Sequence, residues 1–174
     1  MGGGNAAVFD KPPPMGYIEL YQTGIVRKGA ERVHLTQEAD CAVRILYCLA
    51  KNGRRMEGRA VGGEMAVPLR FCLKILGKLA AAGLVTSYKG NGGGYELARG
   101  ADQITLLDAI AAVEGPYRLS RCLCEPDGEA GECTRGASGS CPFQRVFGRV
   151  SATVNRELAA VTLDSILREE AENS

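Results

Sequence analysis

The chain has 174 residues and a formal net charge of +1, with 45% hydrophobic and 24% charged residues. This length allows one ordinary domain, or a small domain with an oligomerisation element, and is too short for a multidomain enzyme. No apolar stretch reaches the roughly 20 residues of a membrane-spanning helix, so no membrane association is expected. Residues 1–33 also lack the apolar core of a secretory signal, which favours a cytoplasmic protein with reduced cysteines.

The charge is distributed unevenly along the chain. Residues 1–50 carry five basic and five acidic side chains, residues 51–99 carry nine and three, and residues 100–174 carry seven and twelve. A basic block beside an acidic one is typical of a phosphate-contacting module joined to a module that makes no such contact. A solvated basic surface without a nucleic-acid partner is the alternative that charge alone leaves open.

The first regular segment is predicted to be an amphipathic helix over residues 36–52. Thr36 is an acceptable N-cap, apolar residues follow at three-and-four spacing, and Gly53 ends the pattern. Residues 1–33, by contrast, contain glycine and proline clusters without a sustained hydrophobic period, so we expect a disordered leader there. A short, glycine-containing helix is predicted next, over residues 58–65.

The helix after Pro68 carries the main functional signal. Its apolar residues form one stripe, whereas Arg70, Lys74 and Lys78 recur every four residues on another face. Two strand-like runs follow, at residues 84–88 and 95–98, around a glycine-rich turn. This pattern predicts a β-hairpin whose tip presents few side chains.

Helix, helix, basic helix and hairpin is the order of a winged helix-turn-helix. In that motif the third helix enters the major groove, and the wing lies along the backbone or minor groove. Residues 34–99 are therefore predicted to be a DNA-binding domain whose partner is a double-stranded promoter operator. The residues expected at the DNA are Thr36, Gln37, Pro68, Arg70, Lys74, Lys78, Lys89, Gly90 and Asn91.

Residues 100–141 are predicted to form a linker helix and a cysteine-rich loop. Beyond it, Pro142 opens a long helical pattern whose apolar residues keep a period of about 3.5 residues. We expect residues 142–170 to be a dimerisation helix, because helix-turn-helix proteins commonly bind two half-sites as dimers. Packing of the same stripe within one chain is the alternative. The predicted fold is mainly α, a winged helix-turn-helix with a small β-hairpin wing and a long C-terminal dimerisation helix.

Two groups of cysteines have different expected roles. Those on apolar helix faces are expected to be small core residues: Cys41, Cys48 and Cys72. The others lie in one glycine-rich loop with the spacing C-x-C-x8-C-x7-C, at Cys122, Cys124, Cys133 and Cys141. This spacing matches neither common zinc knuckles nor bacterial ferredoxins. Ligation, bridging or redox chemistry remains the expected role of the loop cysteines.

Several motifs together resemble a known family of regulators. They are the run from Leu35 to Asp40, the runs 42–46 and 73–76, Ala82-Gly83-Leu84-Val85, and the wing sequence Gly92-Gly93-Gly94-Tyr95-Glu96-Leu97-Ala98. With the cysteine loop before a long helix, they resemble the Rrf-two (Rrf2) family, which includes regulators of the IscR, NsrR and RirA types. The resemblance covers residues 33–170. Family chains begin just before the Leu-Thr pair, which suggests Val33 as the translation start.

The resemblance implies a homodimer whose loop cysteines bind an iron-sulfur cluster that sets DNA affinity. The implied ligands are Cys122, Cys133 and Cys141, with Cys124 as an extra thiol that could replace Cys122 or resolve oxidation. IscR-like members place a histidine where this chain has Gln144, a poor iron ligand, whereas NsrR-like members use an aspartate that corresponds to Asp40. The missing histidine favours a 4Fe-4S over a 2Fe-2S cluster.

Other functions remain as alternatives. The loop could be a zinc site or a thiol/disulfide switch on the same DNA-binding module, or the protein could act in electron transfer without DNA. An enzyme is not expected, because the chain has one histidine and neither a Ser/His/Asp set nor a phosphate loop of the G-x4-G-K-S/T type.

Overall fold

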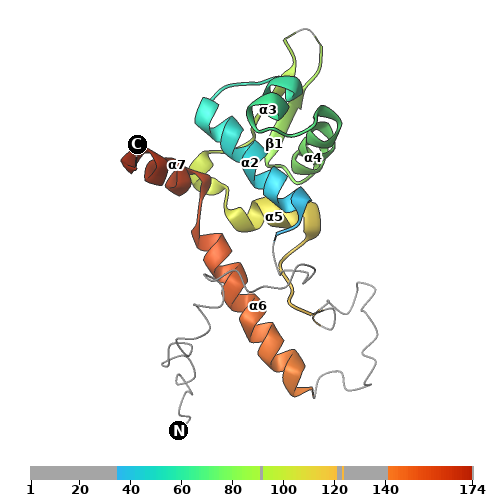
Figure 1. The fold of residues 1–174 in the computed structure, drawn as a ribbon, viewed down its shortest axis with the longest axis vertical. Helices are drawn as coiled ribbons and strands as arrows, with labels where there is room; N and C mark the ends of the chain where they lie inside the picture. Colours follow the sequence, from blue (N-terminus) through green and yellow to red (C-terminus); the bar gives the residue numbers. More distant parts are fainter. Residues whose placement is uncertain (1–34, 91, 121–122, 124–140, 174) are drawn as a thin grey trace, which may run out of the picture. The chain divides into compact units, whose positions relative to one another are not determined.

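The computed structural model describes residues 35–90, 92–120, 123 and 141–173 (Figure 1). Among the sequence predictions, those for the leader, Asn91, Cys122, Cys124 and Cys133 concern residues outside these described ranges. The described chain is mainly helical with one two-stranded antiparallel hairpin, which confirms the predicted fold class. No helix in the described ranges is both long enough and apolar enough to cross a membrane.

Helix α2 spans Gln37–Asn52, as its sequence predicts. Thr36 is the N-cap, and its hydroxyl accepts a hydrogen bond from the backbone N–H of Ala39. Gly53 ends the helix in the left-handed conformation, with φ 58°, which glycine adopts without steric cost. The buried side of α2 is almost fully enclosed and includes Ala42, Ile45, Leu46, Cys48 and Leu49.

Helices α3 (Gly58–Glu64) and α4 (Leu69–Ala81) form a helix-turn-helix. The turn is closed by a hydrogen bond from the N–H of Val67 to the carbonyl of Gly62, at 2.8 Å. The inner face of α4 packs against α2 and α3, so the core holds this helix from one side. Its other side is exposed.

The hairpin pairs β1 (Val85–Tyr88) with β2 (Gly94–Leu97). An isolated bridge between Met56 and Tyr95 ties the hairpin to the connection between α2 and α3. A Cβ atom on Gly94 would lie 2.6 Å from the carbonyl oxygen of Met56, so only glycine allows this close approach. The wing is therefore fixed to the helix-turn-helix by backbone contacts.

A 3-10 turn, η1 (Ala101–Gln103), leads into α5 (Leu106–Glu114). The side chains of Thr105 and Asp108 form a capping box at the start of α5. Helix α5 packs against both α2 and α4 and completes the core that they share.

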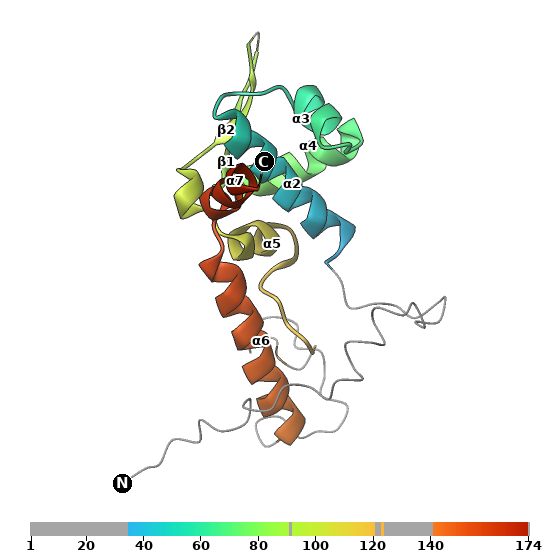
Figure 2. The same cartoon turned by 60° about the vertical axis from the view of Figure 1, so that its left-hand side comes forward.

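The segment predicted as one helix over residues 142–170 is two helices, α6 (Pro142–Ala160) and α7 (Leu163–Glu172) (Figure 2). The chain leaves the helical conformation at Val161, whose carbonyl accepts from the N–H of Leu106, while the N–H of Leu163 donates to the carbonyl of Ile104. Thr162 then starts α7 with its own capping box. Tertiary backbone pairing thus interrupts a continuous apolar pattern.

The turn of the helix-turn-helix generates a stability prediction. A Cβ on Gly62 would lie 2.8 Å from the carbonyl oxygen of Val67, whereas a Cβ on Gly63 would meet nothing within 4 Å. We expect Gly62→Ala to lower the free energy of unfolding by about 1–3 kcal/mol because backbone must move. Gly63→Ala is the matched control and should be neutral or stabilising by up to about 1 kcal/mol. Denaturant unfolding measures both, and equal effects of the two variants would contradict the close contact.

Candidate nucleic-acid interface

Helix α4 has one buried face and one outward face. Cys72, Ile75, Leu76 and Leu79 are fully buried. On the outward face Arg70 and Lys74 are exposed, and Leu73 between them is 42% exposed. Within the described part of the chain, Arg70 has no ion-pair partner. This face offers cationic groups for phosphates together with one apolar side chain, which suits a groove of DNA.

Two of the predicted lysines already have a partner within the protein. Glu38, in the first turn of α2, places Oε1 2.5 Å from Nζ of Lys74 and Oε2 2.7 Å from Nζ of Lys78. Lys78 also donates to the carbonyl of Val113, at 3.1 Å. The ammonium groups of Lys74 and Lys78 hold the pKa of Glu38 below its ordinary value, so its carboxylate is charged at neutral pH. The sequence predicted Lys74 and Lys78 on this face, but not the carboxylate of Glu38 that pairs with both.

The starts of two helices border the outward face of α4. Thr36 and Gln37 are exposed at the beginning of α2. Pro68 is the exposed N-cap of α4, and no side chain caps this helix. Uncapped N–H groups at a helix start are suited to bind phosphate oxygens. These three predicted contact residues are therefore exposed, and their binding to DNA stays a prediction.

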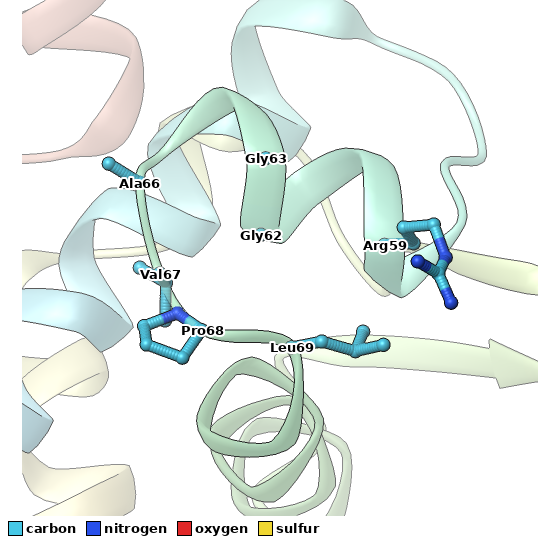
Figure 3. Close-up of a pocket in the computed structure, with 7 residues that line it drawn as sticks. All are labelled: Arg59, Gly62, Gly63, Ala66, Val67, Pro68 and Leu69. Carbon is cyan, nitrogen blue, oxygen red and sulfur yellow. The ribbon is translucent and has the colours of Figure 1, made fainter.

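Residues of α3, of the turn after it and of the start of α4 line an open pocket (Figure 3). Arg59, which lies in α3 and is exposed, contributes a cation that sequence reasoning did not select. Ala66 adopts a positive φ of 53° in this turn. The carbonyl of the preceding residue, Met65, accepts a hydrogen bond from Arg44 Nη1 of α2 at 3.1 Å. The turn is thus held from the side of α2.

The wing carries an ordered polar cluster. The guanidinium of Arg55 lies 3.4 Å from the ring centroid of Tyr88, and the Tyr88 hydroxyl donates to Glu96 at 2.6 Å. The predicted contacts Lys89 and Gly90 follow β1 and are exposed. Gly90 has a φ of 89°, which favours glycine in this turn. The cation–π contact of Arg55 with Tyr88 and the hydrogen bond to Glu96 connect the outer end of the strand pair to the segment before α3.

The three cysteines of the helices are part of the core, as predicted. Cys41 is 2% exposed, and Cys48 and Cys72 are not exposed at all. Burial raises the pKa of Cys48 to about 11, and burial also raises the pKa of Cys72. The thiols of Cys48 and Cys72 therefore remain protonated at neutral pH and are poor nucleophiles and ligands.

Both ends of the cysteine loop are attached to α6. The amide of Asn155 pairs with the backbone N–H and carbonyl of Tyr117, at 3.1 and 3.0 Å, and the Ser151 hydroxyl accepts from the N–H of Leu119 at 2.9 Å. At the other end Cys141 is the N-cap of α6 and is 8% exposed. The chain after α5 therefore enters the loop along α6 and returns to the start of the same helix.

Asp40, the ligand implied by resemblance, is exposed on α2. Its carboxylate forms an ion pair with Arg44 Nη2, at 2.9 Å. The same guanidinium donates to Sγ of Cys41 at 3.4 Å. Among the described residues no group of three potential ligands comes together to hold a metal ion. Since Cys122 and Cys133 lie outside the described ranges, the ligand set stays a prediction.

The arrangement of a helix-turn-helix, a wing and an anchored cysteine loop agrees with a comparison against protein families. Residues 35–169 match the family Rrf2, described as an iron-dependent transcriptional regulator. The chain belongs to the Rrf2 family. An Rrf2-family chain is a regulator that binds DNA, so the basic face of α4 lies on the element expected to contact it.

Related proteins extend the match over most of the chain. A Neisseria meningitidis protein named as an HTH-type transcriptional regulator, NMA1593, is 32% identical over 139 residues, which are 79% of this chain and 89% of that protein. The protein aau3 of Rhizobium meliloti is 30% identical over 141 residues, or 78% of this chain and 86% of that one.

Solved structures show the same fold. The IscR structure from T. potens has a TM-score of 0.64 at 20% identity and covers 84% of this chain and 94% of its own. The structure of CymR, titled the global cysteine regulator of B. subtilis, has a TM-score of 0.59 at 23% identity. The match covers 78% of this chain and 96% of the CymR chain. At these identities the likeness concerns the fold alone.

Proposed function

We propose that the protein is a homodimeric transcription regulator that binds operator DNA through α4 and the wing, and whose cysteine loop holds an iron-sulfur cluster that sets DNA affinity. The observation that carries the DNA-binding part is the outward face of α4. Arg70 and Lys74 are exposed there, beside uncapped N–H groups at the helix start and a wing fixed to the same domain. A cationic helix of this kind fits the major groove.

The described end of the cysteine loop is compatible with a cluster. Cys141 is enclosed at the start of α6, and Arg145 and Arg149 follow on the next turns. A cluster held by thiolates is anionic, and nearby guanidinium groups and a helix N-terminus compensate negative charge. We propose Cys122, Cys133 and Cys141 as ligands, with Asp40 as the fourth and a 4Fe-4S cluster as the form. Such a cluster would supply sensitivity to iron, nitric oxide or oxidants.

The cysteine loop and α4 are linked through α5, which packs against α4. Tyr117 is held by α6, and α5 ends three residues earlier at Glu114. The carbonyl of Val113, in the last turn of α5, binds Lys78 of α4. A rearrangement of the loop could therefore displace α5 and change the position of α4. This connection supports a loop that regulates DNA affinity.

A thiol/disulfide switch or a zinc site on the same DNA-binding domain is the second candidate. It is favoured by the loop spacing C-x-C-x8-C-x7-C, which differs from that of bacterial ferredoxins and offers Cys124 as a fourth thiol. Cys41, Cys48 and Cys72 are enclosed in the core of the domain, so the loop cysteines are the candidates for this chemistry. The metal and sulfide content of the purified protein distinguishes the two candidates.

The homodimer is inferred from the apolar stripe of α6. Ser151, Asn155 and Gly148 face the segment that leads into the loop. The start of the neighbouring apolar stripe is exposed in the described part of the chain, where Phe143 is 56% and Val146 45% exposed. Large apolar side chains exposed side by side on a helix are typical of subunit interfaces in soluble proteins.

DNA binding is tested with Arg70→Ala. We expect weaker binding to duplex DNA and a slope of log K against log salt that is shallower by about 0.9, because one phosphate contact is lost. Arg168→Ala, whose side chain is 76% exposed on α7, is the matched control. Fluorescence anisotropy at several salt concentrations gives both slopes. Identical slopes for the two variants would contradict this placement of α4.

The cluster is tested by anaerobic purification with iron and acid-labile sulfide analysis. We expect iron, sulfide and broad visible absorption in the wild type, all lost in Cys141→Ala and in Cys133→Ala because each removes a ligand. Cys48→Ala, which changes a core thiol, should keep them. Colourless wild-type protein that contains zinc or no metal would contradict the cluster and leave the thiol or zinc candidate.

The dimer is tested by placing a charge in the stripe of α6. Val146→Glu should convert a dimer into a monomer, since a buried unpaired carboxylate is costly at an apolar interface. Ala152→Glu is the control, because Ala152 is exposed on the opposite side of α6. Sedimentation velocity reports the mass of each. A wild-type monomer, or a dimeric Val146→Glu protein, would refute the assignment.

A further inference from the structure

The ion pair between α2 and α4 lies outside the apolar core, on the surface of α4 that is proposed to face DNA. Glu38 has only one negative charge and holds two cations, Lys74 at 2.5 Å and Lys78 at 2.7 Å. Its side chain is 21% exposed, whereas that of Lys74 is 59% exposed. The carboxylate therefore lies behind a lysine that can reach solvent and a ligand.

The two lysines differ in what else holds them. Lys78 is 35% exposed and also donates to the carbonyl of Val113, so it joins three helices from within. The only other described contact of Lys74 is the distant ring of Phe71, with Nζ 5.9 Å from the ring centroid. If the charge of Glu38 were removed, Lys74 would be released and Lys78 would keep its carbonyl partner.

A carboxylate at this place has an effect on DNA binding that can be derived from electrostatics. DNA phosphates attract cations regardless of base sequence, and each cation that replaces a condensed counterion adds to the affinity and to its salt dependence. An internal carboxylate competes with phosphate for the same ammonium group and repels the DNA backbone. It lowers the sequence-independent part of the affinity without changing any group that reads bases.

We propose that Glu38 is an internal counter-anion that weakens the contact of Lys74 with DNA phosphates and so limits the non-specific DNA affinity of the protein. This inference rests on the proposed function, because it takes α4 to face DNA. Glu38 is a positioning residue that acts through Lys74. The alternative is that Glu38 only links α2 to α4. In that case, loss of the Glu38 charge would loosen the domain and weaken DNA binding.

The test is Glu38→Gln on the full-length protein with a duplex of random sequence, which needs no knowledge of the operator. The substitution keeps the size of the side chain and removes its charge. We expect the variant to bind about eightfold more tightly at about 0.1 M salt, and its log K against log salt to be steeper by about 0.9, the value for one added phosphate contact. Glu172→Gln, with the same charge change on exposed α7, should match the wild type.

Two double variants identify the lysine that is released. Glu38→Gln with Lys74→Ala should lose the gain in affinity and slope, whereas Glu38→Gln with Lys78→Ala should keep it. Thermal melting of every variant separates a loosened domain from a changed charge. Salt slope is the deciding readout, because a structural link alone would not make it steeper.

The outcomes distinguish this inference from the proposed function. Wild-type protein that binds no duplex would refute both. Wild-type protein that binds normally, with Glu38→Gln binding equally or more weakly at an unchanged slope, would overturn the role of Glu38 and leave the DNA-binding proposal intact. A gain that survives Lys74→Ala would likewise overturn the assignment to Lys74.

Discussion

The burial of one apolar face of α2 determines where the functional surfaces lie. Ile45, Leu46 and Leu49 are enclosed by α4 and α5, whose own apolar faces complete the same core. Because α4 contributes one face to this core, its basic face must point outward. The start of α2 lies close enough to α4 for Glu38 to reach its lysines. A change in the packing of α2 would therefore alter both the core and the surface proposed to meet DNA.

The order and bounds of the elements of the DNA-binding domain could be predicted from local signals. Thr36, Gly53 and Pro68 lie at helix ends, where their side chains and backbone angles have a direct physical role. The glycine-rich turn similarly predicted the hairpin. These signals depend on residues close in sequence, which is why they could be recognised without a structure.

Features that depend on distant residues could not be predicted. The break at Val161 results from backbone pairing with Leu106. The apolar period of the sequence continues across Val161, so it did not indicate the break. The pairing of Glu38 with Lys74 joins residues 36 positions apart, so a count of charges predicts a basic face and misses the carboxylate on it. Cysteine spacing indicated a reactive loop, and the family resemblance supplied its proposed cofactor.

In the proposed function, the state of the cysteine loop sets the affinity of α4 and the wing for DNA. The most direct measurement is the affinity of anaerobically purified protein for a duplex selected from a random pool, at one salt concentration, before and after an iron chelator removes the cluster. We expect the affinity to change by about tenfold or more, or at least about 1.4 kcal/mol of binding free energy. Equal affinities, with iron and sulfide shown to be lost, would contradict the claim.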